Sequence, residues 1–152
     1  MSDIMKNNYI HDSLVESYFV DCKNRIITLN LLFDDNYDRV KSKIIFNNVL
    51  AHNFKDSIDF NIIFGIETYE FHQLNKFHKE DLIRIYNHGL PTNISFERQT
   101  NDEDKLLTLK SFLEENNYEI YNIDASLGLC GFVICKDVEI EYLEHIQLKK
   151  EN

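Results

Sequence analysis

The chain has 152 residues, the size of one ordinary domain, and we expect a single domain over 1–152. Its 26 acidic and 16 basic side chains leave a formal net charge of −10, which would repel phosphate backbones and argues against nucleic acid as a direct partner. No apolar run approaches the roughly 20 residues of a membrane span, and the first residues lack a signal-peptide pattern. We therefore expect a cytoplasmic protein that makes no membrane contact.

The first half of the sequence has the alternation of β-strands. Apolar runs at 14–20 and 25–33 flank a short polar stretch, which predicts a hairpin. Further strands are expected around 44–49 and over 60–69, both rich in β-branched and aromatic residues. An acidic loop over 34–38 joins the hairpin to the third strand.

The pattern then changes to helical spacing. Apolar residues over 77–86 predict a short helix that ends at Gly89 and Pro91, because glycine accepts the left-handed cap and proline cannot continue a helix. A second helix is predicted to begin after Asn101, which suits the cap position, and to end near Asn116.

Two more strands are predicted after the helices, at 118–124 and 127–142. In the second, Val138, Ile140 and Tyr142 alternate with glutamates, so we expect these three side chains to face the core. The order of strands, helices and strands predicts an α+β fold. It would be a mainly antiparallel β-sheet with two short helices packed against it.

The residue types of a hydrolytic triad stand in a row at His11, Asp12 and Ser13. In an extended segment His11 and Ser13 would share one side and Asp12 the other, whereas a triad needs its contacts in series. The sequence also lacks a G-x-S-x-G nucleophile elbow. We therefore predict no catalytic residue, and interpret the three residues as a structural motif that shapes the start of the first strand through buried hydrogen bonds.

Metal and cofactor motifs are incomplete. The acidic loop opens as D-x-N-x-D, like a calcium loop, but Arg39 replaces its glycine and Ile45 its final glutamate. The histidines lack zinc spacing, and Cys130 and Cys135 would point to opposite faces of one strand. Cys22 falls in the predicted hairpin turn, where it would be exposed. We expect no metal and no cofactor.

Four segments resemble small bacterial immunity proteins of polymorphic toxin systems: HDSLVESYFVD, KIIFNNV, FNIIFGI and YNIDASLGLCGFVICKDVEIEYL. The first opens a hairpin with the H-D-[S/A] pattern. The resemblance implies a non-enzymatic protein that binds one cognate toxin domain and neutralises it, and it brings no catalytic residue with it.

A toxin partner with a basic surface would suit the charge of −10, since opposite charges steer two proteins together. We expect the contact surface to be acidic. The predicted contact residues are Asp34, Asp35 and Asp38 in the acidic loop, and Asp102, Glu103 and Asp104 at the start of the second helix. The loop is the stronger prediction, because the helix dipole already accounts for acids in a first turn.

Two alternatives stay open. One is a hydrolase-like cytosolic enzyme whose catalytic groups come together from distant residues. The other is a structural or interaction domain of a different kind. An enzyme would show turnover without a partner, whereas a structural domain would show neither turnover nor rescue of toxin-poisoned cells.

Overall fold

The computed structural model describes residues 9–92 and 98–148, and within them the chain forms ten helices and strands. They are β1 (Ser13–Asp21), β2 (Ile26–Asp34), β3 (Asp38–Asn47), β4 (Ala51–Lys55), β5 (Ile62–Tyr69), α1 (Phe71–Asn87), α2 (Asp102–Glu115), β6 (Glu119–Leu127), β7 (Cys130–Cys135) and β8 (Asp137–Gln147). The strands make one antiparallel sheet, so the predicted α+β class is confirmed, as is the β1–β2 hairpin.

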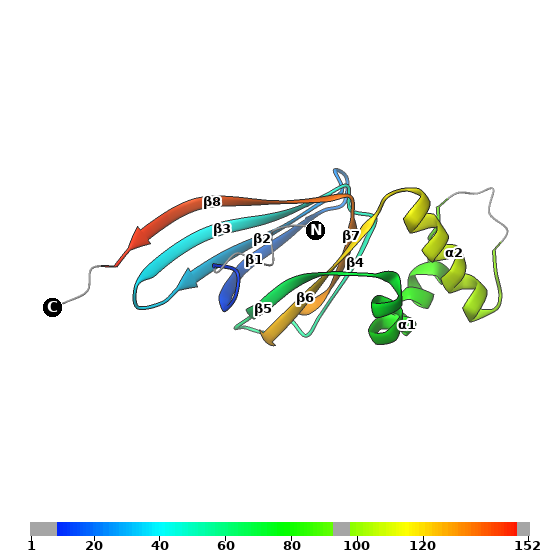
Figure 1. The fold of residues 1–152 in the computed structure, drawn as a ribbon, viewed down its shortest axis with the longest axis horizontal. Helices are drawn as coiled ribbons and strands as arrows, with labels where there is room; N and C mark the ends of the chain where they lie inside the picture. Colours follow the sequence, from blue (N-terminus) through cyan, green and yellow to red (C-terminus); the bar gives the residue numbers. More distant parts are fainter. Residues whose placement is uncertain (1–8, 93–97, 149–152) are drawn as a thin grey trace.

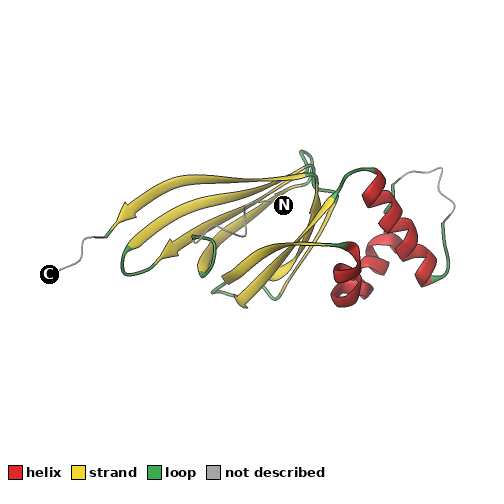
Figure 2. Cartoon of the chain, in the orientation of Figure 1, coloured by secondary structure: helices red, strands yellow, loops and turns green. Residues whose placement is uncertain are grey.

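The sheet is folded over into two layers (Figure 1, Figure 2). Its strand order is β4-β7-β6-β5-β1-β2-β3-β8. Strands β1 and β5 pair through Ser13 with Ile63 and Leu14 with Ile62, a short contact compared with the other pairings. On one side of this junction lie β1, β2, β3 and β8, and on the other lie β5, β6, β7 and β4. The junction therefore divides one continuous sheet into two halves.

The chain passes between the two halves at a corner near the helices. There the Lys136 amide donates to the Asn47 carbonyl at 3.2 Å, and the Leu50 amide donates to the Ile134 carbonyl at 2.8 Å. The prediction of one strand over 127–142 is wrong, because the chain turns this corner: β7 pairs with β4, and β8 pairs with β3. The short strand β4 on the same corner was not predicted.

Apolar side chains between the two halves form the main core. The alternation predicted for β2 is confirmed, since Ile27, Leu29 and Leu31 are at most 1% exposed. The other buried members of this core are Ile10, Val15, Ile44, Phe46, Ile63, Ile66, Tyr121, Ile123, Leu129, Val133 and Cys135. Tyr142 was predicted to face the core but is 48% exposed. It lies on the edge strand β8 next to an irregularity in its pairing with β3.

The two helices pack at one end of the molecule, seen at the right in Figure 1. Together with β6 and β7 they enclose a second core made of Leu74, Leu82, Tyr86, Leu90, Leu106, Leu109, Leu113, Ile120, Phe132 and Ile134. The predicted cap of α2 is confirmed, because the Asn101 side chain accepts hydrogen bonds from the Glu103 and Asp104 amides.

Helix α1 is longer than predicted and bends within its length. It begins at Phe71, and His78 departs from helical geometry with φ −133° and ψ 30°. Phe77, one of the apolar residues whose helical spacing predicted this helix, is 62% exposed. A strict 3.6-residue period does not hold across such a bend, so spacing alone misplaces this side chain.

Candidate functional site

The opening motif is a turn that ties the first strand to β5. Asp12 has φ 63°, its amide donates to the Ile63 carbonyl at 2.9 Å, and the Ser13 amide donates to the Ile10 carbonyl at 3.0 Å. Ser13 is fully buried, and its hydroxyl donates to the Tyr9 carbonyl at 2.5 Å. The hydroxyl is therefore bound to backbone and lies away from solvent.

Two details of the expected motif are wrong. His11 and Ser13 do not share a side, because the segment turns at the left-handed Asp12 instead of running extended. His11 also makes no buried hydrogen bond: its Nδ1 lies 2.9 Å from the Asp12 carboxylate, and both side chains are more than half exposed. The His11 ring instead lies against Phe64, with centroids 4.8 Å apart.

This arrangement predicts different effects for two substitutions. Ser13→Ala should lower the free energy of unfolding by about 1 kcal/mol, because it removes the hydroxyl that donates to the part-buried Tyr9 carbonyl. His11→Ala should change it by less than about 0.5 kcal/mol, since an exposed pair contributes little. Urea denaturation of both variants measures this difference. A larger loss in His11→Ala than in Ser13→Ala would contradict it.

The predicted acids of the β2–β3 turn all have partners within the chain. The Asp34 carboxylate lies 3.0 Å from Arg39 Nε, and the Asp38 carboxylate lies 2.7 Å from His145 Nε2. Asp35 Oδ1 accepts from the amides of Tyr37 and Asp38 at 2.7 and 2.6 Å. These contacts shape the turn, and they leave less unpaired charge there than the sequence implies.

The second predicted group lies at the start of α2. Asp102 is 3.6 Å from Lys105, and Glu103 and Asp104 sit in the first turn, where the helix dipole favours acids. In Figure 1 this turn and the β2–β3 turn stand at opposite ends of the molecule. The structure therefore does not bring the two groups of acids together into one surface, and their part in partner binding stays a prediction.

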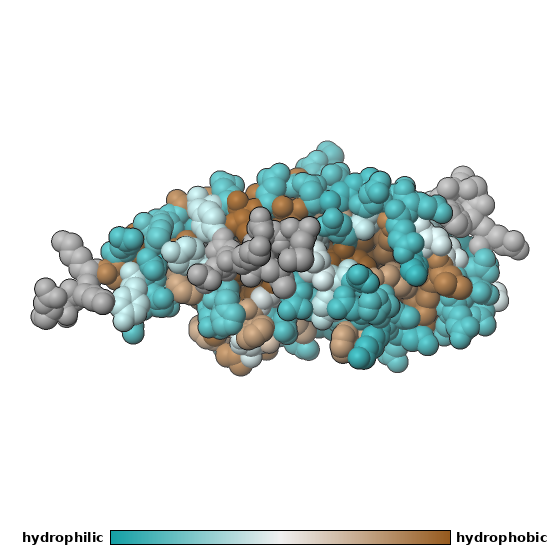
Figure 3. Space-filling model, viewed as in Figure 1, coloured by the Kyte–Doolittle hydropathy of each residue, from teal (hydrophilic) through white to brown (hydrophobic). Residues whose placement is uncertain are grey.

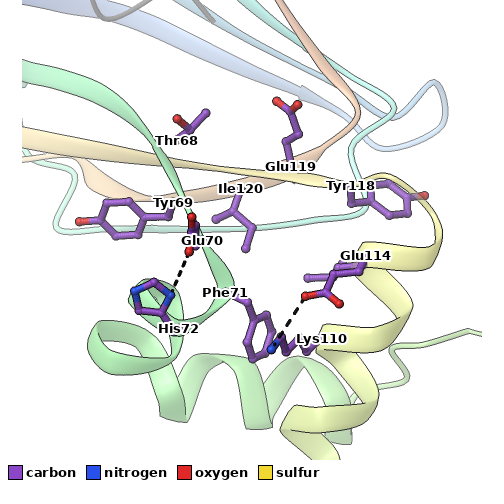
Figure 4. Close-up of a pocket in the computed structure, with 11 residues that line it drawn as sticks. Thr68, Tyr69, Glu70, Phe71, His72, Lys110, Glu114, Tyr118, Glu119 and Ile120 are labelled. Atoms are coloured by element: carbon purple, nitrogen blue, oxygen red, sulfur yellow. Dashed lines mark ion pairs between the residues drawn. The ribbon is translucent and has the colours of Figure 1, made fainter. Parts of the chain in front are cut away.

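A cleft of about 490 Å³ opens where β5 passes into α1 and α2 passes into β6 (Figure 4). It is lined by Thr68, Tyr69, Glu70, Phe71, His72, Lys110, Leu113, Glu114, Tyr118, Glu119 and Ile120. None of these was predicted from the sequence as a site residue, because they come from four separate elements and the turns beside them.

The polar groups of the cleft contact one another. His72 Nδ1 lies 3.2 Å from Glu70, and Lys110 Nζ lies 4.0 Å from Glu114. The Glu119 carboxylate accepts a hydrogen bond at 2.5 Å from Tyr121, which belongs to the main core and does not line the cleft. Figure 4 shows the first two pairs on opposite sides of the opening. Carboxylates and aromatic rings of this kind can hold a cationic side chain.

One of the two tyrosines that line the cleft, Tyr69, is neutral at physiological pH. Burial raises the pKa of Tyr69 above its ordinary value, and the carboxylates of Glu67 and Asp124 raise it further. A phenol with such a pKa can donate a hydrogen bond but is a poor nucleophile at neutral pH.

A buried carboxylate joins β4 to α1. Asp81 is 6% exposed, and its carboxylate lies 2.6 Å from Lys55 Nζ, 3.5 Å from His78 Nδ1 and 3.9 Å from Arg84. Burial acts to raise the pKa of Asp81, but Lys55 and His78 outweigh it and hold the pKa below its ordinary value. The His78 ring in turn packs on Phe132, with centroids 5.1 Å apart. We interpret this cluster as a structural link between sheet and helix.

The three cysteines occupy different environments. Cys22 is exposed in the hairpin turn, as predicted. Cys130 and Cys135 share β7, and Cys135 belongs to the main core, whereas the Cys130 thiol lies 3.7 Å from Asp56. Within residues 9–92 and 98–148, no group of three or more His, Cys, Asp or Glu side chains is placed to hold a metal ion.

These environments predict an order of thiol reactivity. Cys22 should react first with a thiol reagent in the folded protein because it is exposed. Burial, with help from Asp56, raises the pKa of Cys130, and burial together with Asp137 raises the pKa of Cys135 to about 12. Cys130 should therefore react more slowly, and Cys135 only on unfolding. Mass spectrometry of alkylated peptides measures the order, and equal rates for all three would contradict it.

No family model matches the sequence, and comparisons with curated proteins and with solved structures return no match either. The resemblance to immunity proteins therefore rests on the sequence segments alone. Over the part of the chain that the structure describes, neither helix is long and apolar enough to cross a membrane.

Proposed function

We propose that this protein is a non-enzymatic binding protein that docks on a basic protein partner, and that the partner is a toxin domain which it neutralises. The observation that carries the proposal is the combination of a net charge of −10 with large apolar side chains that remain about half exposed. Among them are Ile58, Phe60, Phe64 and Leu127. Apolar side chains surrounded by charge are typical of surfaces that bind other proteins.

The chemistry of the cleft between β5, α1, α2 and β6, and that of the opening motif, agrees with binding. In this cleft the Glu70 and Glu114 carboxylates contact His72 and Lys110, and burial raises the pKa of Tyr69. At the opening motif the Ser13 hydroxyl contacts a backbone carbonyl and not His11. The toxin identity of the partner follows from the resemblance of the sequence segments to immunity proteins.

Co-expression tests the proposal. The product of the neighbouring reading frame should arrest growth of a host cell when it is expressed alone, and the present protein should restore growth when both are made. The control expresses an unrelated acidic protein of similar size, which should not restore growth. A neighbouring product without toxicity, or a toxin that still arrests growth in the presence of this protein, would refute the proposal.

A further inference from the structure

A row of apolar side chains crosses the outer surface of the sheet at the junction of its two halves. Leu14 of β1 pairs with Leu32 of β2 on one side and with Ile62 of β5 on the other, and Ile62 pairs with Leu127 of β6. Paired residues of antiparallel strands share a face, and consecutive residues alternate between faces. Since Val15 belongs to the core, the row points away from the core and toward solvent.

Two aromatic side chains extend this row. Phe64 lies at an irregularity in the pairing of β5 with β6 and is 48% exposed, and Phe60 in the preceding loop is 51% exposed. Ile58 of the same loop is 53% exposed. The Asn61 side chain accepts from the amides of Ile58 and Leu129 at 3.0 and 2.9 Å, which fastens the loop to the β6–β7 turn. The loop is thus held in place beside the row.

We name this region the Phe64 surface. It consists of Leu14, Ile58, Phe60, Ile62, Phe64 and Leu127. Figure 3 shows apolar side chains gathered along the lower edge of the molecule, where Figure 1 places the ends of β5 and β6.

Carboxylates border the Phe64 surface on several sides. Asp56 and Asp59 are exposed on either side of Ile58, and Asp124 is exposed on β6 opposite Gly65. Asp12 is held beside Phe64 through the His11 ring. Lys55, the basic residue next to this loop, already contacts Asp81. The border is therefore negatively charged around an apolar centre.

The charge of this border distinguishes between occupants. A second copy of the chain would bring two acidic borders together, and anionic lipid headgroups or phosphate backbones would be repelled in the same way. A basic protein surface is attracted by the negative charge of the border and can bury the aromatic rings. We propose that the Phe64 surface is the docking site for a basic protein partner, with Phe60 and Phe64 in an apolar recess of that partner. This inference rests on the proposed function and gives it a location.

Calorimetric titration of the purified neighbouring product into variants of this protein tests the inference. Replacing both rings in Phe60→Ala/Phe64→Ala should weaken binding at least 30-fold, as loss of central aromatic contacts does. The matched control is Phe77→Ala, which removes a ring that is 62% exposed on α1 and should leave the dissociation constant within about 2-fold. Thermal unfolding of all variants verifies that they stay folded.

A second pair of variants separates this surface from acidic residues elsewhere on the molecule. Asp56→Asn/Asp59→Asn should slow association about 5-fold at low salt, whereas Glu80→Gln/Glu115→Gln removes the same charge from exposed positions on α1 and α2 and should leave association unchanged. Equal binding by all variants and the wild type would overturn the docking site while the proposed function stands. Failure of the wild type itself to bind would overturn both.

Discussion

We expect Gly131→Ala to lower the free energy of unfolding by roughly 3 kcal/mol. Gly131 has φ 144°, a conformation that side chains with a Cβ rarely adopt. A Cβ at this position would lie 1.8 Å from the Asn53 carbonyl oxygen, which belongs to the paired strand β4. Backbone atoms cannot move aside cheaply, so the substitution should separate β4 from β7.

Gly65→Ala is the matched control, because Gly65 lies within β5 and a Cβ there would meet no atom within 4 Å. Its free energy of unfolding should stay within about 1 kcal/mol of the wild type. Chemical denaturation of both variants gives the comparison. Equal stability of Gly131→Ala and Gly65→Ala would show that β4 and β7 do not approach each other this closely at Gly131.

Lys55→Met should lower the free energy of unfolding by about 2 kcal/mol, because it leaves the buried Asp81 carboxylate with weaker partners. His78 and Arg84 remain at 3.5 and 3.9 Å, and they limit the loss. Asp81→Leu should lower the free energy of unfolding by less than Lys55→Met does. Lys55 is 44% exposed, so water solvates its ammonium group when the carboxylate is removed. The double variant Lys55→Met/Asp81→Leu should therefore be more stable than Lys55→Met alone. A double variant that is the least stable of the three would contradict this account.

The same ion pair predicts a dependence on pH. The pKa of Asp81 in the folded protein lies below its ordinary value of 3.8, so its stabilising contribution is complete at neutral pH. That contribution is lost as the pH falls through the folded-state pKa. The difference in free energy of unfolding between wild type and Asp81→Leu should hold from pH 7 to about 5 and then shrink on further acidification. A difference that grows in acid would contradict the direction of the pKa change.

Local patterns predicted the parts of the fold that local interactions form. The β1–β2 hairpin follows from alternating apolar residues around a polar turn, and the start of α2 follows from Asn101 as a cap. The division of 127–142 into β7 and β8 could not be predicted in this way. It depends on pairing with β3 and β4, about ninety residues earlier, and such pairing leaves no periodic signal near Lys136.

The same limit applies to the candidate site. The acidic residues of the β2–β3 turn can be recognised in the sequence. The contact of Asp38 with His145 cannot, because it joins residues 107 positions apart. The link between Lys55 and Asp81 spans 26 positions. The Phe64 surface depends on the pairing register of four strands, so its members look like ordinary core residues in the sequence. One signal was available, since Asp81 interrupts an apolar helical stripe next to Leu82.

We propose that the protein acts by stoichiometric binding. Titration of the partner's toxic activity in vitro with increasing amounts of this protein tests it most directly. At a partner concentration well above the dissociation constant, we expect the toxic activity to fall linearly and to reach zero at one equivalent of this protein. The variant Phe60→Ala/Phe64→Ala should not give this endpoint. Complete inactivation by a small fraction of an equivalent would show turnover, and would contradict the account in favour of an enzyme.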